Sequence, residues 1–153
     1  MNPAEVLTKC DEPMVGAAVL KALNLLFEKD SQLLAINASE RAIAAKLAQY
    51  LQPHFPNYHV DVEYNRMGEA PKKVAWSEKP DEVYPDIIVH VRMTDTNILA
   101  IELKKDSNTE KKDRDILKLK AYRRELGYAH ALFVRLGVGK DSGTISECEW
   151  VTQ

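Results

Sequence analysis

Two acidic residues and a lysine lie at the ends of two apolar segments, where their side chains could act together on one ligand. Asp86 opens the segment DIIVHV, and Glu102 and Lys104 lie near the end of the segment ILAIELKK. The polar stretch MTDTN between the segments predicts a β-hairpin with its turn near residues 94 and 95. In such an antiparallel pair the numbers of facing residues sum to about 189, so Asp86 faces a position between Glu102 and Lys104.

Strand alternation places these charged side chains on one face at one end of the hairpin, together with the apolar Ile98 and Ala100. Two carboxylates in such a place repel each other unless a cation lies between them. Lys104 is one candidate for that cation. A hard divalent cation, Mg²⁺ or Mn²⁺, is the other, because two carboxylates and a main-chain carbonyl suffice to hold it together with water. Such an ion would polarise a phosphoryl oxygen and activate a bound water, and Lys104 would orient that water or stabilise charge.

The elements around the hairpin predict an α/β or α+β domain with helices packed on a mixed sheet. Helical periodicity covers 14–30, 37–52 and 111–126; strands are predicted over 58–65, 129–136 and 144–151, with a short edge strand in 72–76. Asn37 and Glu40 form a capping-box pattern at the start of the second helix, and Gly127 is expected to cap the third. Glu40 also shares the inward face of Ile43 and Leu47.

Composition favours one globular domain without a membrane span. The 153 residues are 45% apolar and 29% charged, and no apolar run approaches the roughly 18 residues that a span requires. The polar N-terminus does not resemble a secretory signal, and two distant cysteines indicate unpaired thiols in a cytoplasmic protein. Net charge is −2, yet residues 104–124 hold nine Lys/Arg against four Asp/Glu. That segment is either a solvated helix face or a phosphate-binding edge.

The combination of Pro85-Asp86 and Glu102-Leu103-Lys104, followed by a basic helix, resembles the PD-(D/E)XK nuclease superfamily. The resemblance covers residues 37–136 and is nearest to small prophage- or restriction-associated members. It implies a restriction-endonuclease-like core of order α-β-β-β-α-β, with a central mixed sheet flanked by helices. Residues 1–36 would then be an N-terminal helical extension and residues 137–153 a C-terminal strand of the same single domain.

The resemblance also implies a role for each matching residue in a Mg²⁺- or Mn²⁺-dependent nuclease. Asp86 and Glu102 correspond to the metal-binding acids, Leu103 to the residue that lends its main-chain carbonyl, and Lys104 to the catalytic lysine. Glu40 corresponds to the additional acid that many members supply from the first core helix; its capping role with Asn37 is the alternative. The residues expected to contact nucleic acid are Arg66, Lys105, Lys118 and Tyr122, whereas His90, on the face of Asp86, is expected to be packed or partly exposed.

The resemblance implies a substrate and leaves two alternative functions open. DNA is the expected substrate because most members of the superfamily cut DNA. No DNA-recognition domain is appended within the 153 residues, so specificity would come from a homodimer, a partner subunit or the loop 66–82, unless cleavage is nonspecific or structure-selective. The alternative function is a non-catalytic nuclease-fold module that binds nucleic acid or serves as a subunit of a complex. An incidental Asp-Glu-Lys network in a structural protein is a third interpretation.

Overall fold

A five-stranded mixed sheet forms the centre of the computed structural model, which describes residues 2–64, 73–74, 81–82 and 84–152. Its strand order is β1-β4-β5-β6-β7, and only the β5–β6 pair is parallel. The strands are β1 (His59–Val62), β4 (Ile87–His90), β5 (Asn97–Lys105), β6 (His130–Leu136) and β7 (Ile145–Trp150). Two further strands, β2 (Lys73–Val74) and β3 (Asp81–Glu82), pair with each other.

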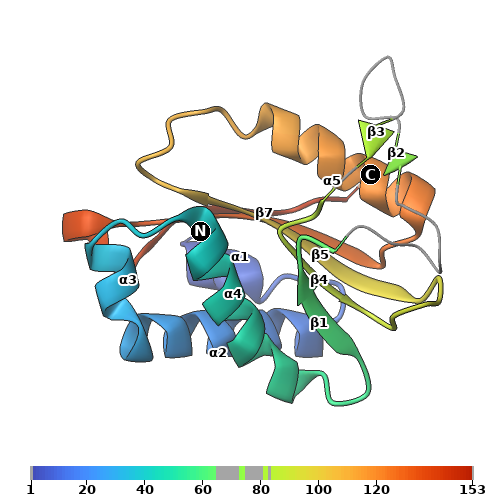
Figure 1. The fold of residues 1–153 in the computed structure, drawn as a ribbon, viewed down its shortest axis with the longest axis horizontal. Coiled ribbons are helices and arrows are strands. Elements are labelled where there is room, and N and C mark those ends of the chain that lie inside the picture. The colour runs from blue at the N-terminus through green and yellow to red at the C-terminus, as the bar shows by residue number, and fades with distance from the viewer. Residues whose placement is uncertain (1, 65–72, 75–80, 83, 153) are drawn as a thin grey trace.

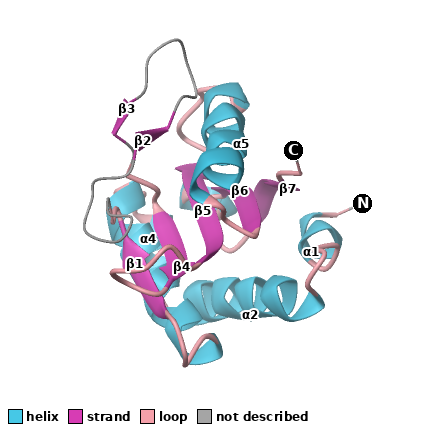
Figure 2. Ribbon diagram, turned by 90° about the vertical axis from the view of Figure 1, so that its right-hand side faces the viewer, coloured by secondary structure: helices cyan, strands magenta, loops and turns pink. Residues whose placement is uncertain are grey.

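Helices cover both faces of the sheet, which makes the protein a three-layer α/β domain (Figures 1 and 2). One face packs against α2 (Pro13–Lys29) and α4 (Glu40–Leu51), and the other against α5 (Asp113–Leu126). Helix α5 is the crossover that joins the two parallel strands, as a parallel connection requires. A helix-flanked mixed sheet is therefore confirmed.

Two short helices absent from the sequence prediction, α1 (Pro3–Leu7) and α3 (Ser31–Ala35), complete the first layer. Helix α1 lies against β7, where the Trp150 indole donates hydrogen bonds to the carbonyls of Val6 and Leu7 at 3.1 and 3.3 Å. Leu7 belongs to the same core as α2 and α4. Residues 2–36 are thus integral to the packed domain, and the C-terminal strand β7 is a member of the main sheet.

The hairpin has the predicted faces with one exception. Ile88 and Ala100 belong to the core under α5, whereas Ile87, Leu99 and Ile101 belong to the core under α2 and α4. Val89 pairs with Leu99 but His90 pairs with Asn97, which leaves Ile98 as the extra residue of a β-bulge. Because the bulge breaks the alternation, Ile98 packs against the opposite core, so its predicted position beside Ala100 is wrong.

The start of α4 differs from the predicted capping box. Ser39 is the N-cap residue, and its hydroxyl accepts a hydrogen bond from the Ala42 amide at 3.1 Å. Asn37 lies outside the helix with a left-handed φ of 57°, so it cannot cap it. This leaves the Glu40 side chain available for another contact. The prediction for the end of α5 is confirmed, since Gly127 follows the helix with φ 70°.

Neither cysteine forms a disulfide, and no helix within the described ranges is long and apolar enough to cross a membrane.

Candidate functional site

The candidate site lies where β5 runs past the beginning of β4. The last paired residues are Ile87 and Ile101, so the amides of later β5 residues on this side need other acceptors. The Asp86 carboxylate accepts a hydrogen bond from the Leu103 amide at 2.7 Å. The Glu40 carboxylate accepts one from the Lys105 amide at 2.8 Å. Two carboxylates from distant parts of the chain therefore line one open strand edge.

The Leu103 carbonyl points to the same edge. The N–H and C=O groups of one strand residue point the same way, and the Leu103 amide already faces Asp86. The edge therefore presents a carboxylate and a main-chain carbonyl side by side. The assignment of Asp86 and the Leu103 carbonyl to a metal ion stays a prediction.

Glu102 is a buried acid adjacent to Asp86. Only 5% of its surface is exposed, and its Oε1 accepts a hydrogen bond from the Tyr122 hydroxyl at 2.9 Å. The carboxyl group of Asp86 lies close enough to that of Glu102 for the two to influence each other's pKa. Burial, followed by the charge of Asp86, holds the pKa of Glu102 well above its ordinary value. Burial also raises the pKa of Asp86.

Lys104 does not bridge this acid pair. Its Nζ lies 3.0 Å from Asp115 and 3.1 Å from Glu110, both of which follow it in the chain. Burial alone would lower the pKa of Lys104, but the hydrogen bonds to Asp115 and Glu110 outweigh this effect and raise it. Lys104 is therefore a firmly protonated cation at the border of the site. The raised pKa of Glu102 favours its neutral form, which reduces the repulsion between the two acids without Lys104.

One face of α5 forms the second wall of the site. Asp115, Lys118 and Tyr122 recur at intervals of three and four residues, so they lie on one helix face. Asp115 binds Lys104, Tyr122 binds Glu102, and the charge of Lys118 lowers the pKa of Glu102. Asp115 was not among the site residues predicted from the sequence. Its spacing three residues before Lys118 was the only available signal.

The residues predicted to contact nucleic acid have different positions. Lys105 and Lys118 are half-buried beside the acids, and Arg66 lies outside the described residues. Tyr122 is only 1% exposed, so the prediction that it contacts nucleic acid needs correction. Its ring belongs to the core under α5 and its hydroxyl positions Glu102. A buried aromatic side chain cannot reach a phosphate from this place.

His90 is packed, as expected, and it belongs to a separate network. Its Nε2 lies 2.7 Å from Asp61 Oδ2, and its ring lies 4.7 Å from the ring of Tyr64. Arg92 holds Asp61 from the other side, through hydrogen bonds of 2.9 and 2.5 Å. These contacts fix β1 against β4 at the opposite end of the hairpin from Asp86.

Asp86, Glu102 and the Leu103 carbonyl are the groups that could hold a hard divalent cation. The described residues contain no cluster of three His, Cys, Asp or Glu side chains arranged around one ion, so the fit depends on fewer ligands. Asp86 and Glu102 each have one carboxylate oxygen beyond those bound by Leu103 and Tyr122. Together with the Leu103 carbonyl they would offer three oxygens to a Mg²⁺ ion, which retains several waters.

Comparisons with protein-family models, curated proteins and solved structures found no match for this chain. The function proposed for the chain therefore rests on the geometry of the site.

Proposed function

We propose that this protein is a Mg²⁺- or Mn²⁺-dependent nuclease of the PD-(D/E)XK type that hydrolyses phosphodiester bonds, with DNA as its substrate. The observation that carries the proposal is the proximity of two carboxyl groups beside Lys104 at an open strand edge. Asp86 is half-buried and Glu102 is buried. Burying two acids together is costly, and a bound cation would offset that cost.

The topology supports the proposal. Three antiparallel strands, β1, β4 and β5, are followed by the crossover helix α5 and the parallel strand β6. Helix α4 precedes them, which gives the order α-β-β-β-α-β that the resemblance implies for a restriction-endonuclease-like core. In this order the end of β5 meets helices from both layers, so acids from separate elements reach one place.

Each side chain has a defined role in this proposal. Asp86 and Glu102 would hold the ion together with the Leu103 carbonyl, and the ion would supply Lewis-acid activation of a water and of the phosphoryl oxygen. Tyr122 keeps the Glu102 carboxyl in one orientation through its hydroxyl. Lys104, held as a cation, stabilises the negative charge that develops on the phosphate.

Glu40 has a supporting role. Its carboxylate is tied to the Lys105 amide and lies 3.5 Å from the Asn108 side-chain nitrogen. Its negative charge raises the pKa of Asp86, so it adds to the attraction that the edge exerts on a cation. Lys105 and Lys118, at the border of the acids, supply positive charge for a phosphate backbone.

The test is cleavage of linear, circular, branched and single-stranded DNA, with RNA in parallel, in the presence of Mg²⁺ or Mn²⁺. Wild-type protein is expected to cut at least one DNA form, and chelation is expected to stop it. Asp86→Asn keeps an acceptor for the Leu103 amide but loses the charge, so it should abolish cleavage without unfolding the protein. Cleavage that persists in Asp86→Asn would refute the assignment.

The second candidate function is a non-catalytic module of the same fold that binds nucleic acid or a partner subunit. The specific observation in its favour is the engagement of Lys104 by Asp115 and Glu110, which withdraws the lysine from the acid pair. Calorimetric titration with Mn²⁺ separates the two functions. A nuclease binds the ion and releases a proton, because the raised pKa of Glu102 favours its neutral form before the ion binds. A module takes up no ion and binds DNA equally well with or without Glu102→Gln.

A further inference from the structure

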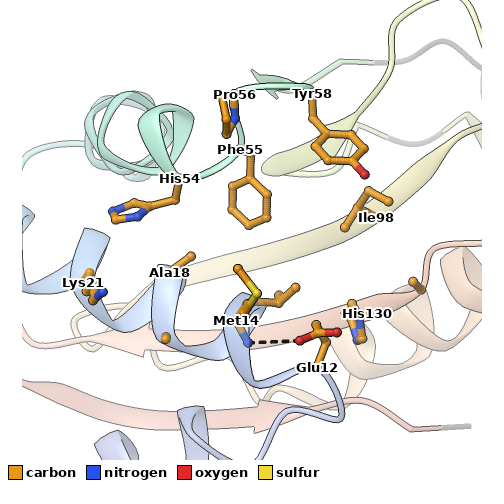
Figure 3. Close-up of a pocket in the computed structure, with 13 residues that line it drawn as sticks. Glu12, Met14, Ala18, Lys21, His54, Phe55, Pro56, Tyr58, Ile98 and His130 are labelled. Atoms are coloured by element: carbon orange, nitrogen blue, oxygen red, sulfur yellow. Dashed lines mark hydrogen bonds between the residues drawn. The ribbon is translucent and has the colours of Figure 1, made fainter.

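An apolar pocket with a volume of about 540 Å³ opens at the other end of β5 (Figure 3). It lies between the first turns of α2, the segment 54–58 and the first residues of β5 and β6. Ile98 in its wall is four residues from Glu102, or about 13 Å along the strand. The pocket is therefore separate from the acid pair, and its role does not depend on the proposed nuclease activity.

The size and the walls of the pocket suit a small organic molecule. Ligand sites typically measure about 300–1,000 Å³ and combine apolar walls with a few polar groups. Figure 3 shows Phe55 and Tyr58 on one side of the space, Met14 and Ala18 on the other, and Ile98 near Tyr58. Two aromatic rings and a flexible thioether favour a flat apolar body.

Two features of the backbone shape the walls of this space. The bulge in β5 turns Ile98 away from the α5 side, so its side chain packs with the core on the pocket side. Pro53 and Pro56 flank the turn that carries Phe55, which is only 8% exposed and anchored in the same core. Met14, in contrast, is 79% exposed at the rim.

The polar groups of the pocket are unequally engaged. Figure 3 shows Glu12 and His130 at one end, and Glu12 already accepts a hydrogen bond from the Met14 amide at 3.2 Å. The His130 ring nitrogen Nδ1 faces the Cys10 sulfur at 3.6 Å. Burial, followed by the charge of Arg123, lowers the pKa of His130, which keeps this imidazole neutral.

The other end of the pocket carries an uncommitted positive charge. Lys21 and His54 lie there in Figure 3, and no ion pair of the described residues involves Lys21. An anionic group at this end would meet an ammonium and an imidazole, while its apolar body would lie against Phe55 and Tyr58. We infer that the pocket is a binding site for a small aromatic anion, with its ring between Met14 and Phe55 and its charge at Lys21.

The probe for this inference is 8-anilinonaphthalene-1-sulfonate, an aromatic anion, paired with its uncharged analogue N-phenyl-1-naphthylamine. Wild-type protein should bind the sulfonate saturably at one site with a fluorescence increase. Ala17→Trp fills the mouth of the pocket from an exposed helix position and should weaken both probes at least about tenfold. Ala45→Trp, at an exposed position on α4 that does not line this pocket, is the matched control and should change neither.

A pair of lysine variants tests whether Lys21 binds the charge of the anion. Lys21→Gln should weaken the sulfonate about twofold to fivefold, as expected for one exposed ionic contact, and leave the uncharged probe unchanged. Lys29→Gln, later in the same helix, should affect neither probe. Unchanged binding in Ala17→Trp would overturn the site. Equal affinity of both probes, or a sulfonate affinity that Lys21→Gln leaves unaltered, would overturn its preference for an anion.

Discussion

Replacing Glu102 with Gln should stabilise the metal-free protein at neutral and alkaline pH. Burial, followed by the charge of Asp86, raises the pKa of Glu102 in the folded protein. The folded chain therefore binds more protons than the unfolded chain once the pH exceeds the unfolded pKa of about 4.3. The free energy of unfolding of the wild type falls as the pH rises from that value towards the folded pKa, and it stays low above it. Gln at position 102 does not titrate, so the variant lacks this loss of stability at high pH.

The size of the gain follows from the same contacts. Each unit by which a folded carboxyl pKa is raised costs about 1.4 kcal/mol above that pKa. Gln still offers an oxygen to the Tyr122 hydroxyl and adds an amide donor towards Asp86, so no hydrogen bond is lost. We expect Glu102→Gln to gain about 1–3 kcal/mol at pH 8, or about 2–12 °C in Tm, and nothing at pH 4.

Thermal unfolding followed by circular dichroism, in chelator and from pH 4 to 8.5, measures this difference. Glu28→Gln makes the same change at an exposed position of α2 and should leave Tm unchanged at every pH. A lower Tm of Glu102→Gln at pH 8, or an equal shift at pH 4 and pH 8, would refute the reasoning. Either result would mean that the folded protein stabilises Glu102 as an anion.

Three further substitutions test other contacts by urea unfolding. Burial would raise the pKa of Asp61, but its hydrogen bonds, first among them those from Arg92, hold it below its ordinary value. Asp61→Asn should therefore lower the free energy of unfolding by about 1–3 kcal/mol at pH 7. This loss should shrink as the pH falls through the folded pKa of Asp61, and a loss independent of pH would contradict the reasoning. Lys104→Met should lower the free energy of unfolding by about 2–4 kcal/mol because it removes the ion-pair partner of the buried Asp115. Adding Asp115→Asn should recover part of that loss. Gly16→Ala should cost about 1–3 kcal/mol, since its Cβ would lie 2.3 Å from a carbonyl oxygen of α1; unchanged stability would show that α1 is loosely docked.

The hairpin was the most predictable part of the molecule because alternation has a period of two and both of its faces are buried. That pattern placed Asp86 and Glu102 on one face, and the structure brings their carboxyl groups into contact. The register differed by one residue, since facing residues Ile87 and Ile101 sum to 188. The bulge at Ile98 left no signal in the sequence because an extra apolar residue in a strand looks like any other.

The partners of the charged residues could not be predicted from the sequence. Asp115 lies in a helix rich in charged residues, where an acid normally faces water. Its burial depends on the approach of Lys104 from β5, a contact that only the packed fold creates. Glu40 followed Asn37 at capping-box spacing, yet the left-handed backbone at Asn37 moved the cap to Ser39. The capping preference of the local sequence was thus not followed, and Glu40 instead accepts a hydrogen bond from the distant Lys105 amide.

The most direct test of the proposed nuclease is the rate of DNA cleavage as a function of Mg²⁺ concentration, measured for wild type, Glu102→Gln and Glu28→Gln. Wild type and Glu28→Gln should show the same saturable dependence on Mg²⁺. Glu102→Gln should be slower by at least about a hundredfold, because it retains the fold but loses a charged ligand of the ion. A rate in Glu102→Gln equal to that of wild type, or cleavage independent of Mg²⁺ and Mn²⁺, would contradict the assignment of the Asp86–Glu102 pair as the metal centre.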